Sequence, residues 1–163
     1  MKRGSARITC ILIMMLFSAP LAARDLPVIG WLENVLIEGG KLEFEAKIDT
    51  GADISSVNAQ SVHQYTRDGE DWLKVRLVNK EGKSVTLDKK LVRYAIIKRK
   101  QAEPVRRPVI NLSLCVGHIE RSVEVNLAKR NNYKYKMLIG RNYLRDSYLA
   151  SSSNVFSTKP LCR

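Results

Sequence analysis

The chain has 163 residues, a formal net charge of +12 and three cysteines. This length suits one domain with a modest core, and no Gly/Ser-rich linker or internal repeat divides the sequence. A surface this basic favours anionic partners such as acidic peptides, cell-wall polymers or lipid head groups. No basic segment is interleaved with aromatic residues, so nucleic acid is not an expected partner.

Residues 1–23 have the layout of a secretory signal peptide. A basic start with Lys2, Arg3 and Arg7 precedes an apolar run at residues 8–17, and Pro20 and small residues follow. The run is short for a bilayer span, which takes about 20 residues, although an uncleaved anchor is the alternative. We expect an exported, periplasmic protein, peripheral to the membrane at most, whose single domain covers residues 24–163. Its charge would be +9, since the leader carries three basic residues and no acidic one.

Two strands joined by a turn are predicted between residues 28 and 48. Residues 28–32 and 35–37 are apolar and β-prone, and residues 38–40 read Glu-Gly-Gly. The following segment alternates apolar and charged residues, which is the period of two of a half-buried strand. Its apolar face comprises Leu42, Phe44, Ala46 and Ile48.

Asp49, Thr50, Gly51 and Ala52 follow this strand directly. The glycine permits an unusual backbone turn, and a carboxylate placed there can face a cleft and hold a water molecule. The alternative interpretation is an ordinary hairpin turn, because Asp and Gly are among the commonest turn residues.

The rest of the chain is also mostly β-structure. Residues 72–78 and 84–87 alternate around a turn and predict a hairpin. Strand patterns recur over residues 91–97, 109–116 and 123–127, with a charged loop expected at Lys98–Arg107. Helical signals are confined to residues 59–65 and 142–147. Such a chain is expected to close as an all-β, mostly antiparallel barrel with one short C-terminal helix.

A second informative segment lies near the C-terminal end. The short apolar run Met137–Ile139 leads into Gly140, Arg141 and Asn142. A buried strand that enters a glycine and then a helix start is the wrong composition for an ordinary surface loop.

Together, "IDTGAD" and "LIGRNYL" resemble the two signature segments of retropepsin-like aspartic proteases, the retroviral protease family. The chain is more closely similar to the bacterial family labelled "ATP-dependent zinc protease", whose members are regarded as retropepsin-like. The further matching segments are "KIDTGA", "DWLKVRL", "RRPVI" and "EVNL". The resemblance covers roughly residues 28–150 and implies a small acid-protease barrel with peptide-hydrolysing activity.

The resemblance also implies residue roles. Asp49 would be the catalytic carboxylate, and the Thr50 hydroxyl would reach across a dimer axis. Gly51 and Ala52 would offer backbone groups to the carboxylate and the substrate.

Asp53 would line the substrate site and pair with Arg141. Through this pair, the helix of Gly140, Arg141 and Asn142 would support the loop. Related bacterial members commonly carry a basic residue where this chain has Asp53, which leaves substrate preference less defined than the fold.

Carboxylate-catalysed peptide hydrolysis takes two carboxyl groups that share one proton. This chain has one Asp-Thr-Gly, and its other Asp-Gly, at Asp68, lacks the hydroxyl residue and the preceding apolar strand. An active enzyme would therefore be a homodimer in which Asp49 meets its symmetry mate.

The sequence predicts no cofactor. No Gly-rich loop ends in Gly-Lys-Ser/Thr, as phosphate binding to ATP would require. His63 and His118 lie 55 residues apart with no His-Glu-x-x-His arrangement, and Cys115 with His118 supplies too few ligands for zinc.

Cys115 and Cys162 form an even pair in the exported chain. A disulfide between them would close a loop of about 48 residues and contribute about 4 kcal/mol on the chain-entropy model. Two free thiols are the alternative.

Two segments are candidates for a flap over the cleft, Asn79–Ser84 and Lys98–Arg107. The second is rich in basic residues, which would favour an acidic peptide or protein substrate; a solvated loop is the alternative. These residues are Lys98, Arg99, Lys100, Arg106 and Arg107.

Two functions from different classes fit the sequence. One is an exported aspartic endopeptidase that acts as a homodimer; a peptidase for isopeptide or amino-acid-tail amide bonds, which the same carboxylates could serve, is a further option that the sequence does not distinguish from it. The other is a non-catalytic periplasmic β-barrel module that binds an anionic cell-envelope partner and keeps the Asp49 loop as architecture.

Overall fold

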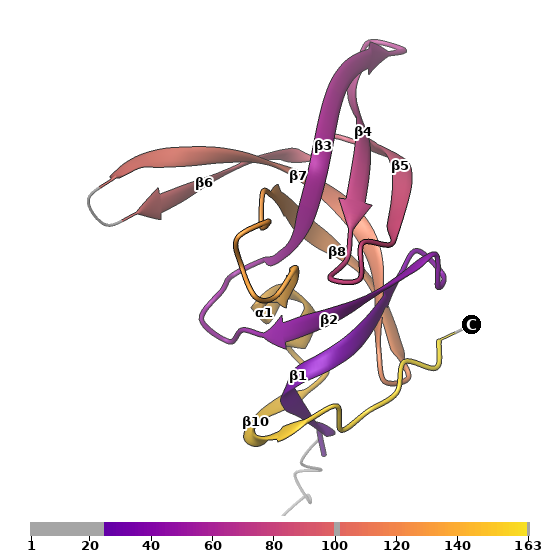
Figure 1. The fold of residues 1–163 in the computed structure, drawn as a ribbon, viewed down its shortest axis with the longest axis vertical. Helices are drawn as coiled ribbons and strands as arrows, with labels where there is room; N and C mark the ends of the chain where they lie inside the picture. The colour runs from indigo at the N-terminus through magenta and orange to yellow at the C-terminus, as the bar shows by residue number, and fades with distance from the viewer. Residues whose placement is uncertain (1–24, 100–101, 163) are drawn as a thin grey trace, which may run out of the picture.

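The computed structural model describes residues 25–99 and 102–162; the predicted leader lies outside this range. Ten strands and one short helix are arranged around a single barrel (Figure 1). In chain order they are β1 (Val28–Ile37), β2 (Leu42–Ile48), β3 (Ser55–Arg67), β4 (Glu70–Val78), β5 (Ser84–Lys90), β6 (Arg93–Arg99), β7 (Ala102–Val116), β8 (Ile119–Ala128), β9 (Met137–Ile139), α1 (Arg141–Leu144) and β10 (Leu149–Val155).

The barrel closes through a pairing between β1 and β7. The sheet runs in the order β10-β1-β2-β9-β3-β8-β7-β6, and Leu36 and Ile37 of β1 pair with Cys115 and Leu114 of β7. Most pairings are antiparallel, whereas β1–β10, β2–β9 and β3–β8 are parallel. The prediction of a mostly antiparallel, retropepsin-like β-barrel with one short C-terminal helix is confirmed.

The apolar face predicted for β2 is the face that the structure buries. The four apolar residues of its predicted inner face are each no more than 6% exposed, and Phe44 is 1% exposed. They pack with apolar residues of β7, β8 and β9 in one core, where burial of each large side chain stabilises the fold by about 1.5–3 kcal/mol.

Two hairpins extend beyond the barrel, β3–β4 and β6–β7 (Figure 1). The helix predicted over residues 59–65 is wrong, because β3 continues there and pairs with β4. Val62 lies opposite Val75, and Tyr65 lies opposite Trp72. These β-branched and aromatic pairs favour the sheet over the weak local helix signal.

The charged loop predicted at Lys98–Arg107 is also wrong, since β6 and β7 occupy this region apart from residues 100–101, which lie outside the description. Pro104 and Pro108 fall within β7. Its pairing with β8 begins only at Val109, so both prolines lie where one side of the strand has no partner among the described strands. A strand tolerates proline at such positions.

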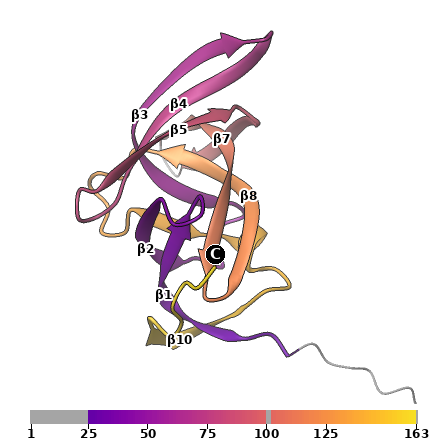
Figure 2. The same cartoon turned by 90° about the vertical axis from the view of Figure 1, so that its right-hand side faces the viewer.

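The C-terminal segment is tied back to the barrel. Cys115 and Cys162 form a disulfide with Cα atoms 6.0 Å apart, and the Leu161 N–H donates to the Gly117 carbonyl at 2.7 Å. Figure 2 shows this segment returning beside β1 and the β7–β8 hairpin. Cys115 therefore does not form a ligand pair with His118.

The same segment encloses a buried carboxylate. Glu33 of β1 is fully buried and accepts hydrogen bonds from Gly30 N (2.7 Å), Ser157 N (2.9 Å), Ser157 Oγ (2.5 Å), and Thr158 N and Oγ1 (both 3.2 Å). Burial alone raises the pKa of Glu33, but the bonds from Ser157, Gly30 and Thr158 together hold it below its ordinary value of 4.5.

Glu33→Gln should destabilise the protein by about 2 kcal/mol at neutral pH, because charge-assisted hydrogen bonds are lost. A lowered pKa in the folded state means that this contribution is complete above pH 4.5 and is lost as the pH falls through the folded-state pKa. Urea denaturation of both proteins from pH 7 downward measures it.

Glu43→Gln, at an exposed position on β2, is the matched control and should change stability by less than about 0.5 kcal/mol. A difference between wild type and Glu33→Gln that stays constant with pH would contradict the role given to this carboxylate.

Candidate active site

Asp49 stands where β2 ends beside β9. The two strands run parallel, with Ile48 opposite Ile139, and the Asp49 N–H donates to the Ile139 carbonyl at 2.8 Å. Its side chain is half-buried, directly after a strand whose inner face is in the core. The sheet therefore fixes the backbone of this residue and leaves its carboxylate within reach of solvent.

The loop after Asp49 is a tight turn. Ala52 N–H donates to the Asp49 carbonyl at 3.1 Å, and Gly51 N–H donates to Asp49 Oδ1 at 3.2 Å. A Cβ atom on Gly51 would lie 3.3 Å from that oxygen, so the absent side chain leaves room for the carboxylate. The Thr50 side chain is exposed and makes no hydrogen bond to another described residue.

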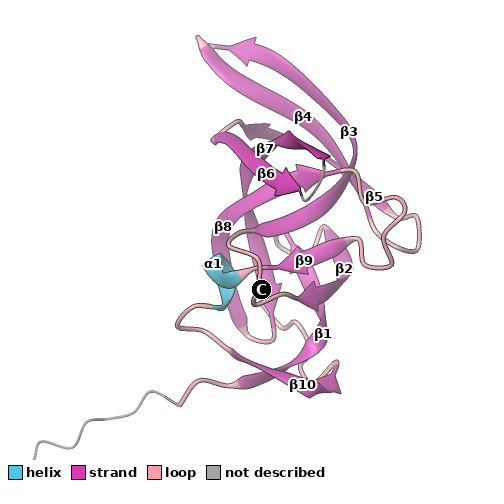
Figure 3. Ribbon diagram, turned by 90° about the vertical axis from the view of Figure 1, so that its left-hand side faces the viewer, coloured by secondary structure: helices cyan, strands magenta, loops and turns pink. Residues whose placement is uncertain are grey.

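Gly140 and α1 hold this loop through backbone contacts. Figure 3 shows α1 next to β9, the strand that precedes it. Arg141 N–H donates to the Ala52 carbonyl at 2.9 Å, and Asn142 N–H donates to the Asp53 carbonyl at 3.1 Å. A Cβ atom on Gly140 would lie 2.6 Å from the carbonyl carbon of Ile54, and only glycine allows this approach.

The Asn142 side chain is the main polar tie between α1, β3 and β8. Its Oδ1 accepts from Ser55 N at 3.0 Å and Ser55 Oγ at 3.1 Å, and its Nδ2 donates to the Glu124 carbonyl at 2.8 Å. The Ser55 hydroxyl also accepts from Gly140 N at 3.1 Å. Because Ser55 is fully buried, these bonds have no water to replace them.

Asp53 and Arg141 form an ion pair, and Arg141 Nη1 also donates to the Thr50 carbonyl at 2.8 Å. The Asp53 side chain is 85% exposed and that of Arg141 44% exposed. An exposed pair contributes under about 1 kcal/mol. The buried Asn142 bonds, and not the ion pair, therefore dominate the attachment of α1 within one chain.

A groove of about 410 Å3 lies between the Asp49 loop and the β6–β7 hairpin. Three arginines line it together with small and apolar residues. The described residues that line it are Ala52, Asp53, Ile54, Ser56, Arg93, Ala95, Ile96, Ile97, Arg107, Asn126, Arg130 and Leu138.

Of the two flap candidates, only the β6–β7 region borders the groove. The turn at Asn79–Ser84 joins β4 to β5 elsewhere on the barrel, where Asn79 Nδ2 donates to the Glu43 carbonyl at 3.0 Å. Within β7, Arg107 lines the groove, whereas the guanidinium of Arg106 lies over the Tyr94 ring, 4.2 Å from its centroid.

Arg130 is the groove residue that the sequence did not single out. It follows β8 in a chain with 28 lysines and arginines, so its residue type alone carried no signal. It is only 7% exposed, and burial lowers its pKa. Burial of an arginine was not readable from the local pattern.

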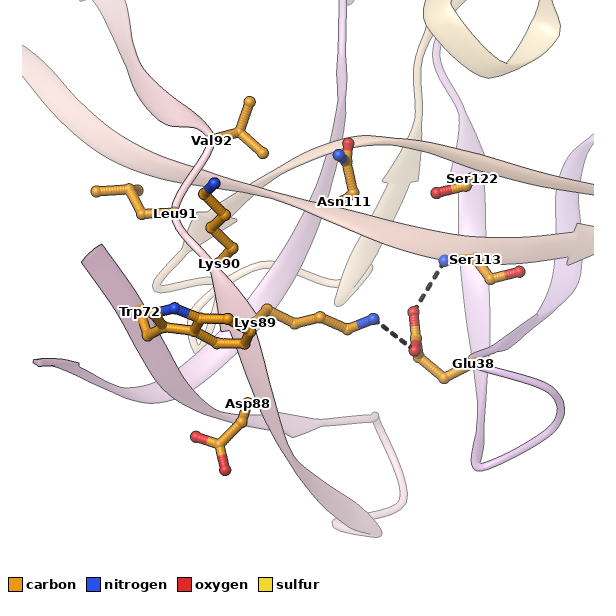
Figure 4. Close-up of a pocket in the computed structure, with 10 residues that line it drawn as sticks. All are labelled: Glu38, Trp72, Asp88, Lys89, Lys90, Leu91, Val92, Asn111, Ser113 and Ser122. Atoms are coloured by element: carbon orange, nitrogen blue, oxygen red, sulfur yellow. Dashed lines mark hydrogen bonds and ion pairs between the residues drawn. The ribbon is translucent and has the colours of Figure 1, made fainter. Parts of the chain in front are cut away.

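A larger cavity, of about 640 Å3, lies on the side of the barrel and contains no residue of the Asp49 loop (Figure 4). Trp72, Asn111 and an ion pair between Lys89 and Glu38 (2.6 Å) lie along it. Asp68 is also distant from the active loop in the fold, since it forms the β3–β4 turn with Gly69, both at positive φ.

In the part of the chain that the structure describes, no three His, Cys, Asp or Glu side chains gather as a metal site requires. Over the same residues, no helix has the length and hydropathy to cross a bilayer.

The fold and the Asp49 loop define a retropepsin-like protein. A family model described as "Retropepsin-like aspartic endopeptidase RimB" matches residues 28–159, and the chain belongs to this RimB-like family. The crystal structure of a protein of unknown function from Legionella pneumophila is similar, with a TM-score of 0.71 and 25% identity over 82% of this chain and 98% of that one.

Two curated relatives are named probable alpha-L-glutamate ligases. The protein of Shewanella pealeana is 30% identical over 69% of this chain, and that of Desulfotalea psychrophila is 28% identical over 63%. The aligned segment spans only about a quarter of either relative, 25% and 23% respectively.

Asn142→Ala should destabilise the protein by about 1–3 kcal/mol, because it leaves the buried Ser55 N–H and hydroxyl without their acceptor. Asp53→Asn, which removes only the exposed ion pair, should cost less than about 1 kcal/mol. Equilibrium denaturation of both variants measures the contrast, and equal costs would show that the ion pair holds α1 as strongly as the asparagine does.

Proposed function

We propose that this chain is an exported aspartic endopeptidase that hydrolyses peptide bonds with a water molecule activated by the paired Asp49 carboxylates of a homodimer. The observation that carries the proposal is the Asp49 loop itself. Asp49 lies half-buried at the end of a core strand, and backbone hydrogen bonds from Arg141 and Asn142 fix the loop that follows it.

The chemistry follows from two carboxyl groups that share one proton. The ionised Asp49 takes a proton from water as the water oxygen bonds to the scissile carbonyl carbon. The protonated Asp49 of the partner donates a hydrogen bond, and then its proton, to the carbonyl oxygen. When the tetrahedral intermediate collapses, the C–N bond breaks and the nitrogen takes the proton held by Asp49. One hydroxyl of the intermediate gives its proton to the partner carboxylate as it becomes the carbonyl oxygen of the acid product, so the pair again shares one proton.

The surface next to Asp49 supports a dimer. Because Leu32 of β1 pairs with Lys47 of β2, the start of β1 lies at the same end of the sheet as Asp49. Val28 is 53% exposed there, and its partner Leu149 on the outer strand β10 is 54% exposed. Thr50 and Leu149 line one hollow of about 320 Å3, which places an apolar patch beside the loop.

An acidic peptide is the substrate class that the groove favours. Arg93, Arg107 and Arg130 line it, and the whole chain carries a net charge of +12. Two curated relatives are named for alpha-L-glutamate, an acidic amino acid that a basic groove would attract. A peptide or amino-acid tail rich in glutamate is therefore the substrate to test first.

Export to the periplasm is part of the proposal. The leader-like composition of residues 1–23 supports it. The Cys115–Cys162 disulfide supports it as well, because such bonds persist in oxidising compartments.

Asp49→Asn should lower kcat for hydrolysis of a glutamate-rich peptide by about 100-fold or more, because an amide cannot accept the proton of the water. The melting temperature should stay near that of the wild type, since the Asp49 side chain accepts one hydrogen bond among the described residues, from the Gly51 N–H, and the oxygen of an asparagine amide can accept it as well. Mass spectrometry of the peptide products measures the loss, and a folded variant with full activity would rule the mechanism out.

Leu149→Asp should convert the dimer to a monomer and abolish hydrolysis together, since a charge on the apolar patch opposes association. Sedimentation and peptide cleavage at matched concentrations measure both effects. Val62→Asp is the control, because Val62 is 41% exposed on the distant β3–β4 hairpin. Full activity in a monomeric Leu149→Asp protein would contradict the two-chain site.

A non-catalytic module that binds an anionic partner is the second candidate. The observation that favours it is the match to about a quarter of much longer relatives, which is compatible with a recognition domain of a larger enzyme. Binding of an acidic polymer that is unchanged in Asp49→Asn, with no cleavage by the wild type, would select this candidate.

A further inference from the structure

Arg130 is a buried cation on the wall of the groove. The residue is only 7% exposed, yet it lines the cavity beside the Asp49 loop. The backbone fixes it, since Arg130 N–H donates to Asn58 Oδ1 at 2.8 Å. A charge in such a place is costly unless an opposite charge or hydrogen-bond acceptors compensate it.

The protein itself compensates only one edge of this guanidinium. Nε donates to the Tyr135 carbonyl at 3.0 Å, and the Tyr133 ring lies with its centroid 4.6 Å from Cζ. Within the described residues, Arg130 takes part in no ion pair, and its two terminal nitrogens donate to no protein acceptor.

Those two nitrogens are nevertheless not fully buried. No buried side-chain nitrogen or oxygen lacks a hydrogen-bond partner in the described part of the chain. The terminal nitrogens of Arg130 have no protein partner, so they must lie at the accessible surface. Arg130 is also one of the residues that line the groove. The fork that an arginine offers to a carboxylate therefore belongs to a groove-lining residue and is not sealed inside the protein.

The charges around Arg130 set what it can bind. The pKa of Arg130 is lowered, mainly by burial and also by the positive charge of Arg107. Tyr133 and Asp49 act in the opposite direction and raise it. Arg107, which donates to Asn126 Oδ1 at 3.3 Å, lines the same groove as Arg130, and Ala52 and Asp53 of the Asp49 loop line it too. Arg93 of the same groove differs from Arg130, because the Arg93 guanidinium is paired with Glu124 at 2.5 Å.

We propose that Arg130 is a specificity-determining residue that binds a carboxylate of the substrate next to the bond that Asp49 cleaves, with Arg107 adding positive charge to the same subsite. This inference rests on the proposed function for the location of the reacting bond. It adds a residue and a contact: one acidic group, held bidentately by the terminal nitrogens of Arg130. An uncharged side chain of the same shape would leave the buried cation uncompensated and would bind more weakly.

Two carboxylates could occupy the subsite, the side chain of a glutamate or the terminal carboxylate of the peptide. Four probe peptides separate them: α-linked oligoglutamate and the matching oligoglutamine, each with a free and with an amidated C-terminus. Preference for glutamate in both terminal forms assigns the side chain. Preference for the free terminus in both sequences assigns the terminal carboxylate.

The wild type should cleave the preferred peptide with a kcat/KM about 10- to 100-fold above that of its uncharged counterpart, the range that loss of one charge-assisted hydrogen bond covers. Arg130→Gln should bring this ratio close to one, mainly through KM. Arg130→Lys should retain part of the ratio, because the charge stays but the bidentate fork is lost. Arg106→Gln, which removes an arginine outside the groove, should keep the full ratio.

A binding measurement keeps the inference testable if Arg130→Gln does not fold. Calorimetry with the Asp49→Asn protein compares the same peptides without hydrolysis, and the acidic peptide should bind about 10- to 100-fold more tightly. Equal Kd values, or a folded Arg130→Gln protein that keeps the wild-type ratio, would overturn the subsite.

The two proposals fail in different ways. Selective binding of the acidic peptide without cleavage by the wild type would leave the Arg130 subsite standing and remove the peptidase. Cleavage of all four peptides at equal rates would leave the peptidase standing and remove the subsite. Absence of both binding and cleavage would overturn the subsite as well.

Discussion

The attachment of the Asp49 loop to Gly140 and α1 is the constraint around which the site is built. The loop itself is a short turn whose internal hydrogen bonds involve only Asp49, Gly51 and Ala52. Its position comes from outside, through β9, through two N–H groups at the start of α1 and through the bonds of Asn142 to Ser55. If the proposed function holds, a carboxylate held in this way needs little reorganisation when a substrate binds.

The same arrangement explains why some elements could be predicted from sequence and others could not. The alternation of β2 and the run Met137–Ile139 are each dictated by burial on one face, and burial leaves a periodic signal. The outer half of β3 shows no such signal, because Gln60–Gln64 is exposed and its strand conformation comes from pairing with β4. Likewise, β6–β7 is a hairpin in which long-range pairing decides the structure of a highly charged segment.

In the candidate site, too, some residues could be predicted from the sequence and others could not. The residues in the two signature segments could be named because each segment is contiguous and distinctive in composition. Arg130 could not, because its importance comes from burial beside a loop 81 positions earlier in the chain. The ion pair of Asp53 and Arg141 was expected on the right residues, yet its energetic weight depends on exposure, which only the three-dimensional structure gives.

The contacts of Glu33 have a consequence for the order in which the chain can mature. Its hydrogen-bond partners at Ser157 and Thr158 lie 124 and 125 residues further on, and Cys162 must then be oxidised onto Cys115. Until the C-terminal segment has been synthesised, the Glu33 carboxylate of β1 lacks the hydrogen-bond donors of Ser157 and Thr158 that compensate its burial. The burial of Glu33 can therefore be completed only after the C-terminal segment has been synthesised.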